Sequence, residues 1–223
     1  MIKGAIFDLD GVIVNTVPFH FKAWQRMFES YGHSFSQQDY FDRVDGKPRL
    51  DGCKAILTDL SDAELQVACD KKQSYFSELL DNEKVIIFQG TISLIKECLA
   101  ANIKLAVASS SKNTLRILKS VEAAYDIPVL SWFDTIVTGN DFKIGKPNPE
   151  IFLTAATRIS ESPDYCIVFE DAVAGVQAAK AGGFFCVGID RHDNPALLNE
   201  ADLIVKDLED ISLDIIKAKK GKN

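Results

Sequence analysis

The chain has 223 residues, of which 47% are hydrophobic and 26% are charged, a composition typical of a water-soluble globular protein. Its 25 Lys and Arg against 32 Asp and Glu give a net charge of −7, which argues against a broad nucleic-acid interface because phosphate neutralisation needs a basic face. The apolar start before Asp8 is too short for a signal-peptide core, and no apolar run reaches the roughly 18 residues of a membrane span, so we expect neither export nor membrane insertion.

The predicted elements begin with a short apolar strand over residues 2–7. Between residues 15 and 88 the pattern becomes helical, because Phe21, Trp24 and Phe28 follow helical spacing and the later stretches contain no convincing strand. We interpret residues 15–88 as a small all-helical cap domain inserted after the first strand.

After about residue 90, strands alternate with longer helical patterns. Several of these strands are almost continuously apolar, as expected where both faces of a sheet are covered, and they span residues 103–108, 135–138, 165–169 and 184–189. This order predicts an α/β fold with a Rossmann-like, doubly wound parallel sheet. Residues 1–14 and 89–223 would then form one discontinuous catalytic core.

Five cysteines favour a reducing compartment. They are odd in number, show no Cys-x-x-Cys pair and mostly lie in apolar runs: Cys53, Cys69, Cys98, Cys166 and Cys186. This pattern suits reduced core thiols, so we expect a cytoplasmic protein.

Polar residues that follow the predicted strands define one candidate site, since ligands of an open parallel sheet bind beyond the carboxyl ends of its strands. Asp8 and Asp10 follow the first strand. The later strands add a serine-rich segment, a lysine between glycine and proline, and an acidic pair: Ser109, Ser110, Ser111, Lys112, Asn113, Lys146, Glu170 and Asp171.

Each of these features has an ordinary explanation when taken alone. An Asp-x-Asp pair is commonly a turn, and the serines before Lys112 could cap a helix. Lys146 could lie in a surface turn, and Glu170 with Asp171 could stabilise a helix N-terminus. Their joint placement after separate strands favours a shared site instead.

Together these residues suit phosphoryl transfer, in which catalysis consists mainly of positioning and electrostatic stabilisation. Asp8 would attack phosphorus and form an aspartyl-phosphate. Because two anions repel, a hard cation is needed, and Asp8, Glu170 and Asp171 supply the oxygen ligands that Mg²⁺ prefers. Ser109 and the amides after it would hold phosphate oxygens, and Lys146 would neutralise the remaining charge.

The same residues occur in the motif order of a known superfamily. Over nearly its whole length the chain resembles the haloacid dehalogenase-like superfamily, through Asp8-Leu9-Asp10-Gly11-Val12, the Ser109 region, Lys146-Pro147 and Glu170-Asp171. The resemblance implies that Asp8 is the nucleophile and a metal ligand. It also implies that Asp10 lends its backbone carbonyl to the metal while its side chain acts as general acid and base.

Within the superfamily, the chain resembles the β-phosphoglucomutases, which interconvert β-glucose 1-phosphate and glucose 6-phosphate through a bisphosphate. Such a mutase needs a second cationic phosphate site. The resemblance implies that Arg49 grips the distal phosphate, which suits the bidentate contacts of arginine, and that Ser111, Lys112 and Asn113 also meet it. It adds His20, Trp24 and Lys72 as substrate-binding positions, and we expect Gly46 and Lys47, in the same cap loop as Arg49, to bind substrate as well.

Some of these positions have alternative explanations. Arg49 and Lys72 could lie on a solvated helix face, and Trp24 could pack in a core. His20 could be an ordinary exposed helix residue, although the resemblance implies that it holds Asp10. Two positions depart from the subfamily pattern. Asn15-Thr16 at the hinge removes a carboxylate near the metal, which bears on closure of the cap, and Lys47-Pro48 in the cap loop leaves the identity of the sugar open.

The sequence thus predicts a Mg²⁺-dependent sugar-phosphate phosphomutase, with β-phosphoglucomutase as the first choice. A phosphatase that uses the same Asp8 is the alternative, and a catalytically silent sugar-phosphate sensor is the third. We expect a monomer whose partner is a small-molecule sugar phosphate rather than a nucleic acid or a membrane.

Overall fold

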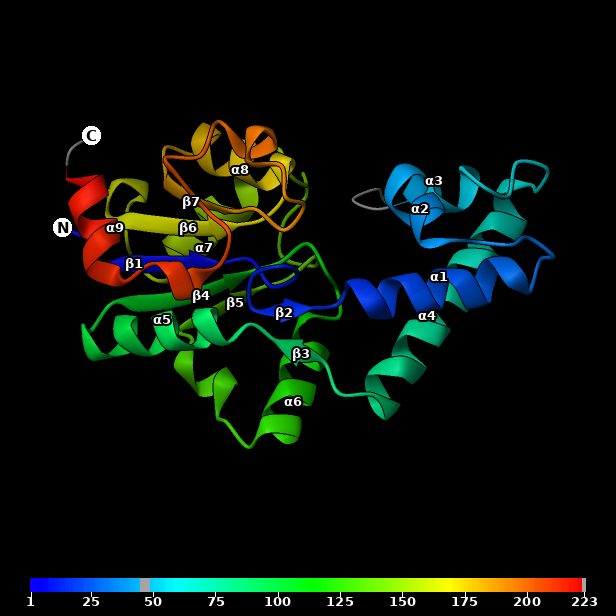
Figure 1. Ribbon diagram of the computed structural model, residues 1–223, viewed down its shortest axis with the longest axis horizontal. Helices are drawn as coiled ribbons and strands as arrows, with labels where there is room; N and C mark the ends of the chain where they lie inside the picture. Colours follow the sequence, from blue (N-terminus) through cyan, green and yellow to red (C-terminus); the bar gives the residue numbers. More distant parts are fainter. Residues whose placement is uncertain (45–48, 222–223) are drawn as a thin grey trace. The chain divides into compact units, whose positions relative to one another are not determined.

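The computed structural model describes residues 1–44 and 49–221, which form two compact units (Figure 1). The core unit consists of Met1–Asn15 and Val85–Asn223, and the inserted unit consists of Thr16–Lys84. Each unit has its own hydrophobic core.

A six-stranded parallel sheet forms the centre of the core unit, with the strand order β5-β4-β1-β6-β7-β8. Its members are β1 (Gly4–Phe7), β4 (Lys104–Ala108), β5 (Thr135–Val137), β6 (Cys166–Glu170), β7 (Phe185–Ile189) and β8 (Leu203–Val205). Every residue of β1, β6 and β7 is buried, which explains why these segments are almost continuously apolar. The predicted α/β fold with a Rossmann-like parallel sheet is confirmed.

The register of the sheet brings the ends of three strands together. Phe7 at the end of β1 pairs with Val107 of β4 on one side and with Phe169 of β6 on the other. The residues that directly follow β1, β4 and β6 therefore share one edge of the sheet, as an open parallel sheet requires of a ligand site.

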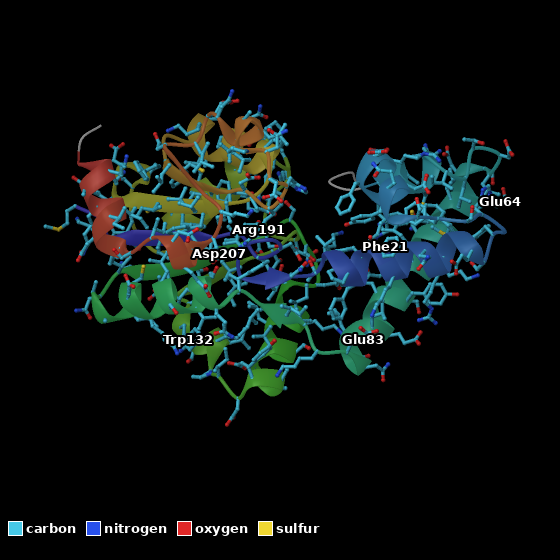
Figure 2. The ribbon with its side chains drawn as sticks, in the orientation of Figure 1. Phe21, Glu64, Glu83, Trp132, Arg191 and Asp207 are labelled. Carbon is cyan, nitrogen blue, oxygen red and sulfur yellow. The ribbon has the colours of Figure 1, made fainter. Side chains whose placement is uncertain are left out.

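Helices and short 3₁₀ segments connect the strands of the core unit. The α-helices are α5 (Gln89–Ala100), α6 (Thr114–Tyr125), α7 (Glu150–Arg158), α8 (Val173–Ala181) and α9 (Leu213–Lys220). The 3₁₀ segments are η2 (Val129–Trp132), η3 (Pro163–Tyr165), η4 (Pro195–Leu198) and η5 (Leu208–Asp210). Figure 2 shows the side chains that these elements carry, including Trp132 of η2.

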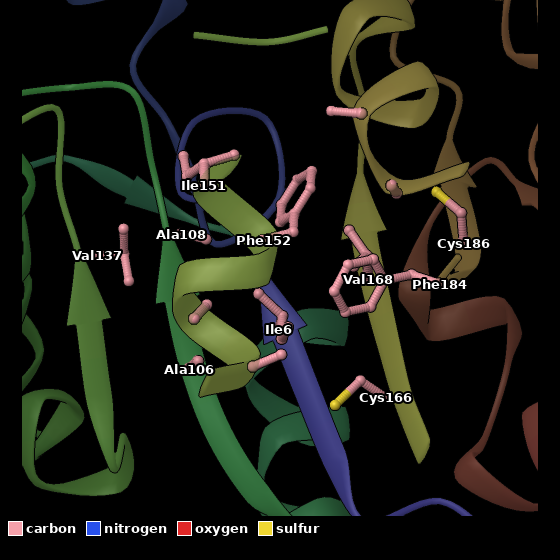
Figure 3. Packing of buried hydrophobic residues seen from close by; sticks show 14 of the residues in the cluster. Ile6, Ala106, Ala108, Val137, Ile151, Phe152, Cys166, Val168, Phe184 and Cys186 are labelled. Atoms are coloured by element: carbon pink, nitrogen blue, oxygen red, sulfur yellow. The ribbon is translucent and has the colours of Figure 1, made fainter. Parts of the chain in front are cut away.

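Side chains from α7 and α8 pack on the sheet and form a hydrophobic cluster (Figure 3). Ile6 of β1 and Val168 of β6 belong to it, together with Ile151 and Phe152 of α7. The cluster is almost fully buried, so it supports the strands whose ends carry the candidate site.

Two very short strands mark the points where the chain leaves and re-enters the core unit. β2 (Val14–Asn15) and β3 (Ile86–Ile87) pair antiparallel, and the amide of Phe88 donates to the carbonyl oxygen of Ile13 at 3.0 Å. The expected return to the core at residue 89 is therefore too late, because this pairing places the segment from Val85 onwards in the core unit. Strands of two residues leave no recognisable sequence pattern.

In the described residues of the inserted unit, all regular secondary structure is helical. It comprises α1 (Val17–Glu29), α2 (Gln37–Asp39), the π-helical turn η1 (Tyr40–Val44), α3 (Arg49–Lys54) and α4 (Asp62–Asn82). A capping box between Ser61 and Glu64 begins α4.

All five cysteines are free and buried, in agreement with the expected core thiols. Among the residues that the structure describes, no helix combines the length and the apolar character needed to cross a membrane.

Candidate active site

The turn after β1, residues 8–13, carries the two predicted aspartates, and we call it the aspartate loop. The amide of Asp8 donates to the carbonyl oxygen of Phe169 at 3.0 Å, and the side chain of Asp8 is almost buried. The amides of Ile13 and Val14 both donate to the carbonyl oxygen of Leu9, which turns the chain back on itself. These bonds hold Asp8 at the edge of the sheet where the strands end.

Lys146 reaches into this edge from the loop after β5. Its Nζ donates to Oδ1 of Asp8 at 2.6 Å and to the carboxylate of Glu170, and its side chain is only 12% exposed. Burial lowers the pKa of Lys146, but the negative charges of Asp8 and Glu170 outweigh this and raise the pKa above its usual value. The interpretation of Lys146 as a surface-turn residue is therefore wrong.

The cluster contains more negative charge than Lys146 neutralises. Burial raises the pKa of Asp8 to about 7; Lys146 opposes this shift, whereas the charges of Glu170 and Asp10 add to it. Burial and the charges of Glu170 and Asp8 likewise raise the pKa of Asp171 well above its usual value. A bound cation would relieve this repulsion.

Two glycines provide the space in which the acidic pair lies. A Cβ atom on Gly11 would stand 1.8 Å from Oδ2 of Asp171, and Gly11 also has a φ of +78°. A Cβ atom on Gly175 would stand 1.7 Å from Oε1 of Glu170, whose Oε2 accepts from the amide of Ala172 at 2.7 Å. Asp171 is thus packed directly against the aspartate loop, and Gly11 is a further site residue, since only its missing side chain leaves room for the Asp171 carboxylate.

The predicted set of Asp8, Asp10, Glu170 and Asp171 is rich in oxygen donors, which is the chemistry that Mg²⁺ prefers. Within residues 1–44 and 49–221, no three His, Cys, Asp or Glu side chains are arranged as a metal cage. Mg²⁺ usually takes only one or two carboxylates and completes its shell with water and phosphate, so this does not argue against it. Lys146 contacts the carboxylates of both Asp8 and Glu170, and the amide of Ala172 donates to Glu170, so these contacts do not separate the carboxylates and all four residues stay the predicted ligands.

The serine-rich segment lies at the same edge, directly after β4. Ser109 is buried, and its Oγ accepts from the amide of Ser111 at 3.1 Å, while Oγ of Ser111 accepts from the amide of Asn113 at 3.1 Å. Helix α6 begins only at Thr114 and its N-cap has no side-chain hydrogen bond, so these serines form successive turns rather than a helix cap. Two predicted ligands, Ser110 and Lys112, are exposed.

Lys72 and His20 form a pair inside the inserted unit. Lys72 is only 3% exposed, and its Nζ lies 2.8 Å from Nδ1 of His20, so the solvated-face interpretation of Lys72 is wrong. Burial, followed by the positive charges of Lys72 and Arg49, holds the pKa of His20 well below its usual value. With Lys72 as an ammonium, Nδ1 of His20 accepts this hydrogen bond and the neutral ring carries its proton on Nε2.

The other predicted residues of the inserted unit differ in their surroundings. Arg49 is exposed, and its Nη2 donates to Oε1 of Gln73 at 2.6 Å, a partner that no motif indicated. Trp24 is 5% exposed and stacks on Phe28, so burial favours its packing role over substrate contact. Gly46 and Lys47 lie outside the described residues.

The chain is similar to known proteins of one family. A family model described as "Haloacid dehalogenase-like hydrolase" matches residues 5–189. The chain is 34% identical over 222 residues to a Bacillus subtilis "Beta-phosphoglucomutase", covering 96% of this chain and 94% of the relative. It is 31% identical over 225 residues to a Thermotoga maritima "Phosphorylated carbohydrates phosphatase", covering 97% and 99%. The crystal structure of a beta-phosphoglucomutase from Clostridium difficile superimposes with a TM-score of 0.83 at 30% identity, covering 100% of this chain and 98% of the other.

Proposed function

The chain belongs to the haloacid dehalogenase-like hydrolase family, and from this premise we propose that it is a Mg²⁺-dependent enzyme that transfers the phosphoryl group of a sugar phosphate. The observation that carries the proposal is the buried cluster of Asp8, Lys146 and Glu170, with Asp171 packed against the same loop. Two buried carboxylates held by one lysine at the end of parallel strands provide a nucleophile and the excess negative charge that attracts a cation.

In the proposed reaction, Asp8 attacks phosphorus and carries the phosphoryl group as an aspartyl-phosphate. Lys146 orients the Asp8 carboxylate through Oδ1 and offers positive charge to the phosphate oxygens. The buried Ser109 and the amides of its turns bind further phosphate oxygens. Mg²⁺, when bound by the four predicted ligands, would supply additional charge stabilisation.

Asp10 is proposed as the general acid and base. It would protonate the oxygen of the departing sugar when Asp8 is phosphorylated, and would later remove a proton from the group that accepts the phosphoryl. If that group is a sugar hydroxyl, the reaction is a mutase reaction with a bisphosphate intermediate. If it is water, the same residues perform phosphate-ester hydrolysis.

The mutase is our first candidate, with β-glucose 1-phosphate as substrate. It is supported by the mutase relatives and by the exposed guanidinium of Arg49, which would bind the second phosphate of the bisphosphate. The phosphatase is the second candidate, because relatives named as sugar-phosphate phosphatases reach 31% identity over 97% of the chain.

One assay separates the two candidates. The purified protein is incubated with Mg²⁺, β-glucose 1-phosphate and a trace of glucose 1,6-bisphosphate, and glucose 6-phosphate and free phosphate are both quantified. A mutase produces mainly glucose 6-phosphate. Predominant release of phosphate from this and other sugar phosphates would select the phosphatase instead. Asp8→Asn should abolish both products, and turnover by that variant would refute the proposed nucleophile.

A further inference from the structure

Arg191 follows β7, and its side chain reaches the aspartate loop of the core unit. Its Nε donates to the carbonyl oxygen of Gly11 at 2.8 Å, and Nη1 forms an ion pair with Oδ2 of Asp207 at 2.7 Å. The guanidinium carbon stands 3.7 Å from the centre of the Phe88 ring. Figure 2 labels Arg191 and Asp207, the two residues of this ion pair. One side chain therefore joins three segments that are far apart in the sequence.

Three consecutive carbonyl groups of the aspartate loop are held by groups outside it. The oxygen of Gly11 accepts from Arg191, that of Val12 from Oγ1 of Thr91 at 2.5 Å, and that of Ile13 from the amide of Phe88 at 3.0 Å. These three carbonyls come directly after Asp10. Of their three donors, Arg191 is the charged one. The main chain directly after Asp10, the proposed acid and base, is thus held both by the segment after β7 and by the segment that begins α5.

The far end of the Arg191 bridge is itself fixed. Oδ1 of Asp207 accepts from the amide of Glu209 at 3.0 Å, and a Cβ atom on Gly90 would stand 2.5 Å from the same oxygen. The side chains of Arg191 and Asp207 are 17% and 31% exposed, so water screens the ion pair only partly. A planar guanidinium can bind a carbonyl and a carboxylate at the same time in a defined geometry, whereas a lysine ammonium cannot reproduce that fork.

One donor of Arg191 remains unsatisfied in the described part of the chain: Nη2 is buried without a hydrogen-bond partner. The bridge is therefore made by Nε and Nη1, while the guanidinium packs on the Phe88 ring.

We propose that Arg191 is a positioning residue for the aspartate loop, acting through the main chain of Gly11 on the orientation of Asp10. The inference rests on the proposed phosphoryl-transfer function and adds to it a residue outside the recognised motifs. Because Arg191 acts on the orientation of a reacting group, its loss should lower kcat more than it raises KM.

Arg158 provides a matched control within the core unit. It forms an ion pair with Asp141 at 2.7 Å and donates to the carbonyl oxygen of Ile136 at 3.4 Å, so it is also an arginine that bridges a carboxylate and a main-chain carbonyl. Its partners belong to β5 and the loop after it rather than to the aspartate loop. R158A therefore removes a comparable bridge that makes no contact with Asp8 or Asp10.

The experiment compares R191A, R191K and R158A by steady-state kinetics and by amide hydrogen exchange of the metal-free proteins. We expect R191A to lose about 10- to 100-fold in kcat relative to R158A, with KM changed by less than about threefold. R191K should remain impaired. The amides of Gly11 and Val14, which donate to Val14 and Leu9 carbonyls within the turn, should exchange faster in R191A than in R158A.

A kcat of R191A equal to that of R158A would overturn the proposal, and so would unchanged exchange at both loop amides. If R191A does not fold, R191K is judged by the same two readouts. Failure of the proposed function would be recognised separately, because the wild-type protein would then be inactive while the exchange comparison still reports on the loop.

Discussion

Gly11 combines a left-handed backbone conformation with close packing against the carboxylate of Asp171. Gly183 also has a positive φ, +77° against +78° for Gly11, but a Cβ atom there would meet nothing within 4 Å. Replacing either glycine by alanine imposes strain of about 1–2 kcal/mol from the left-handed backbone. Only Gly11→Ala also pushes on the Asp171 carboxylate.

We therefore expect Gly11→Ala to lower kcat by about 100-fold or more, since a displacement of about an ångström in a site has effects of that size. Gly183→Ala should be destabilised by the backbone term alone and keep its kcat. Urea unfolding and steady-state kinetics of the two variants measure both effects. Equal kcat values would show that the packing of Asp171 against the loop is unimportant for turnover.

Replacing Arg49 tests the prediction that this residue binds the distal phosphate of a sugar bisphosphate. Arg49→Ala should weaken the binding of glucose 1,6-bisphosphate by about 10- to 100-fold, the range expected for one lost charged hydrogen bond. Turnover of a small phosphate monoester should change much less. Arg26→Ala is the matched control, because Arg26 is a partly exposed arginine of the same unit that pairs with Glu78 at 3.2 Å. Equal losses for both substrates would contradict the assignment.

At the scale of elements, α1 and α4 are joined by the pair of His20 and Lys72. The folded inserted unit holds the pKa of His20 below its unfolded value of about 6.5, so the unfolded chain binds the proton more readily. Stability contributed by neutral His20 is therefore complete above pH 6.5 and is lost as the pH falls below it. The slope cannot exceed about 1.4 kcal/mol per pH unit, because one proton is taken up.

Urea unfolding between pH 7.5 and pH 5 can measure this loss. The chain has two tryptophans, Trp24 in the inserted unit and Trp132 in the core unit, so a Trp132→Phe background reports on the inserted unit. His20→Gln should flatten the pH dependence, whereas His33→Gln, which removes an exposed histidine beyond α1, should preserve it. An identical slope in both variants would exclude His20 as the source.

At the scale of the whole molecule, the chain builds one sheet from two distant segments, and the carboxylates of those segments meet at its edge. A Mg²⁺ ion that binds only there stabilises the folded core unit by mass action. At a concentration ten times its Kd, we expect Mg²⁺ to raise the free energy of unfolding of the core unit by about 1.4 kcal/mol.

Trp132 fluorescence in a Trp24→Phe background reports this shift, and a chelator should reverse it. Asp171→Asn should abolish the Mg²⁺ effect. Asp214→Asn should retain it, because Asp214 is an exposed carboxylate of α9. A shift that survives in Asp171→Asn would place the ion elsewhere.

Much of the core unit was predictable because its strands are buried on both faces. The apolar runs before Asp8 and before Glu170 are rich in β-forming residues, which indicated two buried strands. Because each run ends in carboxylates, the same pattern also indicated a site at the edge of the sheet. β8 was missed because Leu203–Val205 is short and half-buried and so resembles a loop. Arg191 was missed because it carries no motif, and its role depends on partners at Gly11 and Asp207 that only folding brings near.

The sequence by itself determined the parallel α/β core, the helical insertion and the order of the acidic, serine and lysine groups, because hydrophobic periodicity and motif spacing are local properties of the chain. The tertiary structure decided between the alternatives for single residues. Lys146 proved to be a buried partner of Asp8 rather than part of a surface turn, and Lys72 a buried partner of His20 rather than a solvated lysine. The physical reason is that burial and charge pairing depend on contacts between distant segments, which no local pattern encodes.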